Sequence, residues 1–97
     1  LLARYPQSDL AAEAQYYIAE TFAAERKTAE ADSTYRVVAT RWPNAPRTAS
    51  ALYKLGLSLE RQGKRAEARA ALEDVMRRFP RSDEAQLARE RLQELRG

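Results

Sequence analysis

The residues of this chain that could do acid–base chemistry are two pairs of adjacent carboxylates, Glu73–Asp74 and Asp83–Glu84. A general acid–base pair needs both groups aimed at one reacting atom, but neighbouring residues on a helix point about 100 degrees apart. These carboxylates are therefore solvated charges or complements to the positive end of a helix. The chain has no His and no Cys, its five Ser residues have no suitable base nearby, and it has no Gly-rich phosphate loop. We expect no enzyme activity, no cofactor and no metal site.

The chemistry that remains is recognition. Tyr16 and Tyr53 are 37 residues apart, as are Glu20 and Leu57. A tyrosine beside an apolar or charged residue is a composition common in the energetic centres of protein interfaces. These pairs must be positioned by elements that recur with the same period.

Three aromatic–proline pairs divide the chain at that period: Tyr5–Pro6, Trp42–Pro43 and Phe79–Pro80, with the prolines 37 residues apart. A fixed period between about 20 and 50 residues is typical of stacked-repeat proteins, which offer an extended binding surface. Because each aromatic recurs at the same point of its unit, we expect it to pack a helix end against the next unit rather than to contact a partner.

Residues that start or stop helices stand at matching places in the units. Ser8 and Ser82 are good N-caps, and Pro46 fits the first turn of the middle helix. Gly63 suits the left-handed position that follows a helix; the matching stretch of the first unit has no Gly, so Thr28 could cap the next helix instead. The sequence predicts helices over residues 9–24, 28–41, 47–62, 65–78 and 83–96, joined as helical hairpins, and no strand.

Apolar residues recur at helical spacing along four of these helices and predict the core. The stripes are Leu10, Ala14, Ile18 and Phe22; Ala31, Tyr35 and Val38; Leu52, Leu55 and Leu59; and Ala68, Leu72 and Val75. On the last helix, Leu92 should cover the apolar face of the 65–78 hairpin, because terminal units protect an otherwise exposed core.

The units resemble the tetratricopeptide repeat. The second unit reads Leu52-x2-Leu55-Gly56-x2-Leu59, then Ala68-x3-Leu72, then Pro80, and the first reads Gln15-x2-Ile18-Ala19-x2-Phe22, then Ala31-x3-Tyr35, then Pro43. Small residues, Ala19 with Ala31 and Gly56 with Ala68, stand where the paired helices must approach. The resemblance implies an all-α, right-handed solenoid of αα-hairpin repeats that binds other proteins.

The long proline-containing loop narrows the resemblance to the C-terminal domain of the Tol-Pal system coordinator family (YbgF, also called CpoB). The matching stretches are Tyr5–Ser8, Ala14–Glu20, Tyr53–Gly56 and Phe79–Ala85. This resemblance implies a periplasmic module that binds a TolA-type protein in its concave groove during envelope constriction and cell division. Outer-membrane assembly lipoproteins such as BamD use a similar loop, so a structural scaffold repeat or a generic adaptor is the alternative.

In tetratricopeptide folds the first helix of each unit lines the concave face. Removing the core stripes from these helices leaves the candidate partner-binding residues Glu13, Tyr16, Glu20, Ser50, Tyr53, Leu57 and Arg61. The other interpretation is that Tyr16 and Tyr53 pack between adjacent helices with only the hydroxyl group in water.

The charge of the chain is mild and interleaved. The net charge is +3, and all of the excess lies in residues 49–97, which carry eleven basic and eight acidic side chains. Such a surface mostly keeps a protein soluble, so we expect no nucleic-acid partner. The chain has no apolar stretch of about 18 residues, so we expect no direct membrane insertion. Oligomerisation is compatible with this composition.

The period also divides the chain. We expect a single domain over residues 1–97, in which 1–5 end a preceding repeat, 6–43 and 44–80 are repeats, and 81–97 form a C-terminal capping helix. Leu1–Arg4 aligns with Val38–Arg41 and Val75–Arg78, which are expected helix ends. The chain is therefore expected to start inside the last turn of an earlier helix.

Overall fold

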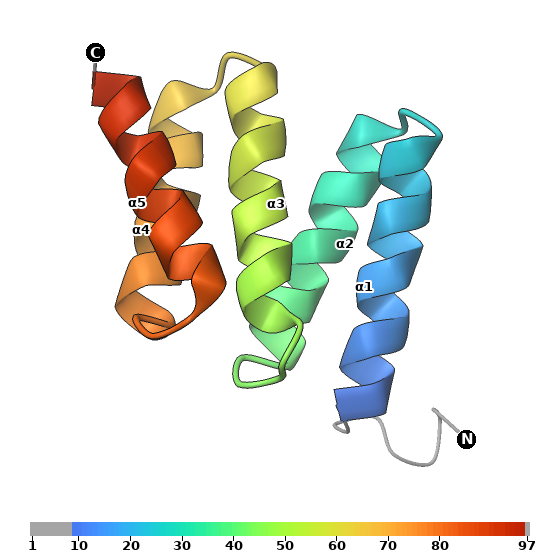
Figure 1. Ribbon diagram of the computed structural model, residues 1–97. Coiled ribbons are helices and arrows are strands. Elements are labelled where there is room, and N and C mark those ends of the chain that lie inside the picture. Colours follow the sequence, from blue (N-terminus) through green and yellow to red (C-terminus); the bar gives the residue numbers. More distant parts are fainter. Residues whose placement is uncertain (1–8, 97) are drawn as a thin grey trace.

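The computed structural model describes residues 9–96, which form five α-helices and no strand (Figure 1). The helices are α1 (Asp9–Ala24), α2 (Thr28–Arg41), α3 (Thr48–Arg61), α4 (Arg65–Arg78) and α5 (Asp83–Arg96). The predicted all-α repeat solenoid is confirmed, and each helix lies within one residue of its expected bounds. The expectations for the Tyr5–Pro6 pair, for Ser8 and for the helix end at residues 1–4 lie outside the described residues.

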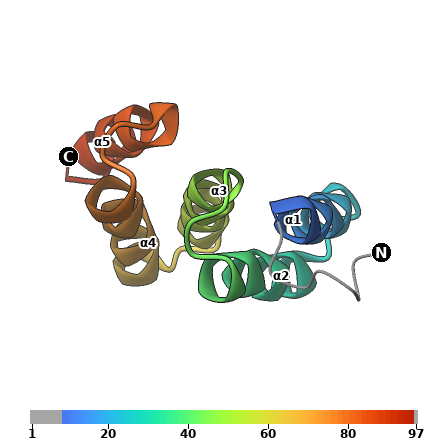
Figure 2. The same cartoon turned by 90° about the horizontal axis from the view of Figure 1, so that it is seen from below.

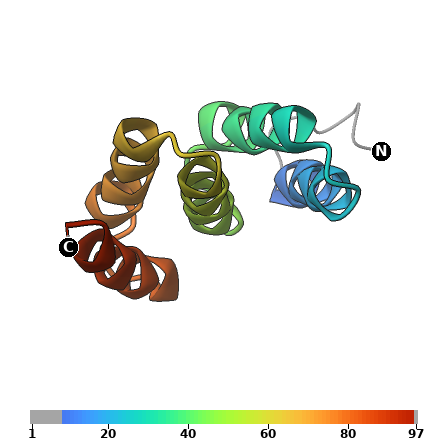
Figure 3. The same ribbon diagram turned by 90° about the horizontal axis from the view of Figure 1, so that it is seen from above.

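The helices form two layers along an elongated body of 47 × 30 × 16 Å. Figures 2 and 3 show α1, α3 and α5 in one layer and α2 and α4 in the other, with the array curving toward the side of α1, α3 and α5. Along the chain, each helix packs against the next one. The inner side of the curve is therefore lined by the first helix of each hairpin.

The caps differ in part from the expectation. Ser82 is confirmed as an N-cap, because its hydroxyl accepts a hydrogen bond of 3.0 Å from the backbone N–H of Ala85. Thr28 is not a cap: it is the first residue of α2, and the N-cap residue Lys27 makes no side-chain capping bond. Pro46 lies in the turn before α3 rather than in its first helical turn, because the side chain of Thr48 bonds back to the carbonyl oxygen of Trp42 and α3 begins at Thr48.

Two equivalent turns use different residues for the same left-handed backbone. Gly63, after α3, has φ of 79°, and Arg26, after α1, has φ of 64°. Gly adopts this conformation without steric cost. An L-residue with a side chain pays roughly 1–2 kcal/mol for it.

We expect Arg26→Gly to stabilise the protein. Relief of the left-handed strain exceeds the extra chain entropy of glycine, so the gain should be about 0.5–1 kcal/mol. Thermal denaturation followed by circular dichroism measures it as a higher Tm. The reverse change, Gly63→Arg, is the matched control and should lower Tm, although a Cβ at Gly63 would meet no atom within 4 Å. A lower Tm for Arg26→Gly would contradict this assignment of strain.

The core confirms three of the four predicted stripes. Leu52, Leu55 and Leu59 of α3 are at most 5% exposed, and the stripes of α2 and α4 are buried as well. The stripe predicted for α1 is confirmed only at Phe22, which packs against the core, whereas Leu10 is 53% exposed and Ile18 is 47% exposed. The buried residues of α1 are instead Ala11, Ala12, Tyr16 and Ala19. The buried face of α1 thus consists of small residues and a tyrosine, while Leu10 and Ile18 lie exposed on another face.

The aromatic residues of the loops belong to the core, as expected. Trp42 is 7% exposed and packs with Ala11, Ala12 and Ala45. The end of α2 is therefore held against the start of α1 as well as against the loop that leads into the next unit. Phe79 is partly buried against a cluster formed mainly by α3, α4 and α5, with Ala39 of α2.

The helices α3 and α4 cross closely at Gly56. A Cβ placed on Gly56 would lie 2.8 Å from Cδ2 and 2.9 Å from Cγ of Leu72, and 3.6 Å from the carbonyl oxygen of Ala68. The expected contact of Gly56 with Ala68 is therefore present, and Leu72 is still closer. A side chain at this position would have to displace Leu72.

Candidate partner-binding groove

A groove is lined by residues of α1, α2 and α3. Its volume is about 280 Å³. The residues that line it are Glu20 and Ala23 of α1, Thr28, Ala31 and Tyr35 of α2, and Lys54, Leu57, Ser58 and Arg61 of α3. Three of the predicted partner-binding residues, Glu20, Leu57 and Arg61, thus come together here.

A network of three residues, Glu20, Tyr35 and Lys54, lines this groove. The Nζ atom of Lys54 lies 2.7 Å from Oε2 of Glu20, and the hydroxyl of Tyr35 donates a hydrogen bond to Oε1 of the same carboxylate. One carboxylate therefore ties α1 to both α2 and α3. Such charge-assisted bonds are stronger than neutral ones, and they fix the spacing of the two walls.

The network sets the protonation of its members. Burial alone would raise the pKa of the Glu20 carboxyl, but the hydrogen bonds from Lys54 and Tyr35 and the nearby positive charge lower it below its ordinary value of 4.5. Burial raises the pKa of the Tyr35 hydroxyl, and the hydrogen bond to Glu20 raises it further. Burial disfavours the ammonium of Lys54, yet the hydrogen bond to Glu20 keeps its pKa above the ordinary value. The network is an ion pair with a neutral phenol at neutral pH.

The lowered pKa of Glu20 predicts a pH dependence of stability. A carboxyl whose pKa is lower in the folded state stabilises the fold above its unfolded pKa of about 4.5, and this contribution is lost as pH falls through the folded value. The free energy of unfolding of the parent chain should therefore exceed that of Glu20→Gln at pH 7, and the gap should shrink by pH 3. Urea denaturation at both pH values measures it, and a gap that stays constant would contradict the network.

A second cluster links the N-terminal half of α1 to Arg47, the residue just before α3. The guanidinium of Arg47 lies 3.2 Å from Oε2 of Glu13 and donates a hydrogen bond of 2.8 Å to the hydroxyl of Tyr17. The same guanidinium lies 5.5 Å from the ring centre of Tyr16 and 5.3 Å from that of Tyr17. Glu13 is therefore engaged with the neighbouring repeat rather than free for a partner.

Contacts between successive first helices recur at one sequence separation. Glu13 with Arg47, Glu20 with Lys54, and Ser50 with Glu84 are each 34 residues apart. This separation is 37 − 34 = 3 residues, about one helical turn, shorter than the repeat period. The first helices run parallel, and each residue contacts the next first helix about one turn before its own equivalent position. The sequence analysis did not identify Arg47 and Lys54, although oppositely charged residues 34 positions apart could have indicated these contacts between repeats.

The remaining predicted residues differ in their availability. Tyr16 is 5% exposed and lies in the core cluster with Tyr35, whose ring centre is 6.1 Å away. The expectation that Tyr16 lies outside the core is therefore wrong, because the alanine-rich face of α1 leaves room that its ring fills. Tyr53 is partly buried against the α3–α4–α5 cluster. Ser50 is half-buried and donates its hydroxyl to Glu84, 2.5 Å away.

Two predicted residues remain open to a ligand. Leu57 is half-buried in the wall of the groove, and Arg61 at its end is exposed. Within residues 9–96, the guanidinium of Arg61 forms no ion pair. An apolar side chain beside an unpaired cation can hold a segment that presents an apolar residue near a carboxylate.

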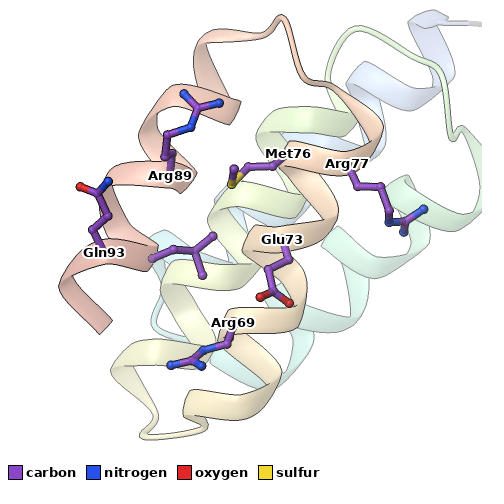
Figure 4. A pocket seen from close by; sticks show the side chains of 7 residues that line it. Arg69, Glu73, Met76, Arg77, Arg89 and Gln93 are labelled. Atoms are coloured by element: carbon purple, nitrogen blue, oxygen red, sulfur yellow. The ribbon is translucent and has the colours of Figure 1, made fainter. Parts of the chain in front are cut away.

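A larger groove, of about 520 Å³, lies between α4 and α5 at the far end of the array (Figure 4). Met76 and Leu92 supply its apolar part, and its charged residues include Arg69 and Arg89. One repeat earlier, the equivalent place lies between α2 and α3, and there α4 packs against α3. In α5 the positions of the buried residues Leu52 and Gly56 are held by the exposed residues Arg89 and Gln93. The face of α5 that carries Arg89 and Gln93 is therefore polar, as expected for a helix surface exposed to water.

Among residues 9–96, no group of three or more His, Cys, Asp or Glu side chains is placed to hold a metal ion. No helix in the same range has the length and apolar character needed to cross a membrane.

Comparison with known proteins adds the family. The sequence pattern of the tetratricopeptide repeat matches residues 13–45 and 50–82, which together make up more than half of the chain. No curated protein is similar enough to the chain to count as a match. The chain belongs to the tetratricopeptide repeat family. Repeats of this family generally mediate protein–protein interaction, and such domains are typically not enzymes.

Proposed function

We propose that this domain is a partner-binding module of the bacterial cell envelope, of the Tol-Pal coordinator type, and that it acts in the periplasm during envelope constriction. The observation that carries the binding role is the groove between α1 and α3, which half-buried Leu57 and exposed Arg61 both line. The coordinator role rests on the sequence resemblance of the proline-containing loops and the first helices. The partner is then a segment of a TolA-type periplasmic protein.

The groove favours one kind of ligand. Its ion pair between Glu20 and Lys54 is internally neutral, so the charge left for a ligand is that of Arg61. Leu57 offers the apolar contact one helical turn earlier on α3. A peptide with an apolar residue and a carboxylate about one turn apart matches both.

Titration calorimetry against a TolA-type periplasmic segment tests this proposal. Leu57→Asp and Arg61→Ala should each weaken binding roughly 30-fold, which corresponds to about 2 kcal/mol for a residue at an interface centre. Arg36→Ala is the matched control: Arg36 lies on α2 in an exposed pair with Glu67, and exposed pairs contribute little. All of these sites are at least partly exposed, so helicity should not change.

Two outcomes would contradict the proposal. If the parent chain does not bind the TolA-type segment, that segment is not its partner. Loss of binding in Arg36→Ala with full binding in Leu57→Asp would place the interaction on the outer layer. Tyr16→Ala is not a useful probe, because Tyr16 belongs to the core and its loss would destabilise the fold.

The second candidate function is a scaffold repeat of an outer-membrane assembly lipoprotein of BamD type. One observation favours it: the exposed apolar stripe of α1, with Leu10 and Ile18, is what a longer array would cover. The upstream gene sequence discriminates the two. A signal peptide followed by coiled-coil heptads supports the coordinator, whereas a lipid-attachment Cys followed by further repeats supports the lipoprotein.

A further inference from the structure

The groove between α4 and α5 extends beyond the hollow described above. A second hollow of about 340 Å³ continues it along α4, because Arg69 and Glu73 line both. Ala66 and Ala70 also line this continuation, and their small side chains let a ligand approach the backbone of α4. The two hollows together form an elongated surface, which suits an extended peptide segment.

This surface is basic. Arg69, Arg77 and Arg89 line the groove, and Arg65 lines its continuation, whereas Glu73 is the one acidic residue that lines either hollow. The whole positive excess of the chain lies in residues 49–97, and these side chains gather much of it on one surface. A concentration of like charge of this kind attracts and orients a ligand of the opposite charge.

Two of these arginines carry a charge that no carboxylate balances. Within residues 9–96, Arg69 forms no ion pair and no hydrogen bond. The guanidinium of Arg89 donates a hydrogen bond of 2.7 Å to Oε1 of Gln86, which is a neutral group. Arg77, by contrast, already pairs with Asp74. A ligand carboxylate therefore gains most at Arg69 and Arg89.

The two unbalanced arginines stand on either side of an apolar patch. Figure 4 shows Arg69 and Arg89 at opposite ends of the groove, with Met76 and Glu73 between them. Met76 and Leu92 are half-buried and pack against the core cluster of α4 and α5. A methionine side chain adapts its shape to what it contacts. The groove thus offers a cation at each end and an adaptable apolar surface in the middle.

We propose that the α4–α5 groove binds an acidic peptide segment of a partner protein, in which an apolar side chain is flanked on both sides by carboxylates. The apolar side chain packs on Met76 and Leu92. The flanking carboxylates pair with Arg69 and Arg89, because a guanidinium matches the geometry of a carboxylate. This docking surface is separate from the groove between α1 and α3, and it does not depend on the function proposed for that groove.

A peptide suits this surface better than an anionic membrane does. Glu73 lies between Arg69 and Arg89 and would repel a dense array of phosphate groups (Figure 4). The same carboxylate can accept a hydrogen bond from a backbone N–H of a peptide. A broad lipid surface also cannot enter a groove whose apolar residues, Met76 and Leu92, are half-buried.

A synthetic peptide tests the proposal. The probe is acetyl-Asp-Glu-Gly-Leu-Gly-Glu-Asp-amide, and its binding to the isotopically labelled chain is followed by amide chemical shifts, which give both the affinity and the place. The largest changes should surround Arg69, Met76 and Arg89. Two control peptides, one with Asn and Gln in place of the acids and one with Ser in place of Leu, should each bind about 10-fold more weakly or worse.

Charge-reversal variants locate the site. Arg69→Glu and Arg89→Glu should each weaken binding of the probe by about 10-fold or more. Lys27→Glu is the matched control, because it makes the same change in net charge at an exposed residue outside the groove. It should change the affinity by no more than about 2-fold, since distant charges are screened. Leu57→Asp in the other groove should likewise have little effect, which separates this proposal from the one above.

Three results would overturn the proposal. Equal binding of the Leu and Ser peptides would show a charged surface without an apolar site. Tighter binding to vesicles that contain phosphatidylglycerol than to the probe, lost in Arg69→Glu, would assign the groove to a membrane. Chemical shifts around Arg69 and Arg89 that depend on protein concentration without any peptide would show that a second copy of the chain occupies it.

Discussion

Gly56→Leu should lower the free energy of unfolding by about 3 kcal/mol or more and the Tm by more than about 10 °C. Already the first atom of a new side chain would lie 2.8 Å from Leu72, which is 0% exposed and packed within a core cluster. Protein interiors are close-packed, so the two helices must separate to admit the added atoms. For a domain with a total stability of about 5–15 kcal/mol, this is a large loss. Urea and thermal denaturation measure it.

The control for Gly56→Leu is Ala70→Leu, which adds a large side chain at an exposed position of the facing helix. It should change Tm by no more than a few degrees. Gly56→Ala should fall between the two, because a gain in helix propensity of about 1 kcal/mol opposes the overlap with Leu72. If Gly56→Leu leaves Tm unchanged, the register of α3 against α4 is incorrect.

Removal of residues 83–97 should abolish the cooperative fold. Leu72 and Val75 of α4 are both 0% exposed and share a core cluster with Ala85, Ala88 and Leu95 of α5. Without α5 these side chains would face water, and the truncated chain should aggregate or lose its cooperative thermal transition. Circular dichroism and size-exclusion chromatography report both effects.

A point variant makes the same test without truncation. Ala88→Asp places a carboxylate at a position with 0% exposure and should cost about 3 kcal/mol or more. Leu87→Asp, at the neighbouring exposed position, should be nearly neutral. A soluble, fully helical truncated chain, or equal effects of the two variants, would show that α5 does not close the core.

The fold was predictable because each level of the sequence indicates the same structure. The period of the proline pairs sets the length of the unit, and the stripes of α2, α3 and α4 have a neighbour that covers them. The stripe of α1 failed for a physical reason: helical spacing shows that Leu10 and Ile18 share a face, but it does not show whether a neighbouring helix is present. The stop after α1 was harder to predict, because Arg26 takes the conformation usual for Gly.

The candidate site was predictable in its location but less so in its chemistry. The first helices do line the inner side of the curve, and Leu57 and Arg61 lie in its groove. Tyr16 was misplaced because a tyrosine suits both a core and an interface, and only the volume left by the alanines of α1 decides between them. The bond of Tyr35 to Glu20 depends on the reach of a side chain from another helix, which no spacing in the sequence specifies.

Amide chemical shifts of the isotopically labelled chain, recorded during titration with the TolA-type segment, test the central claim most directly. The account predicts that the largest changes lie on the inner faces of α1 and α3, around Glu20, Leu57 and Arg61, with little change near Arg36 on α2. Changes centred on the α4–α5 groove, around Arg69 and Arg89, would contradict the assignment of the binding site to the inner groove.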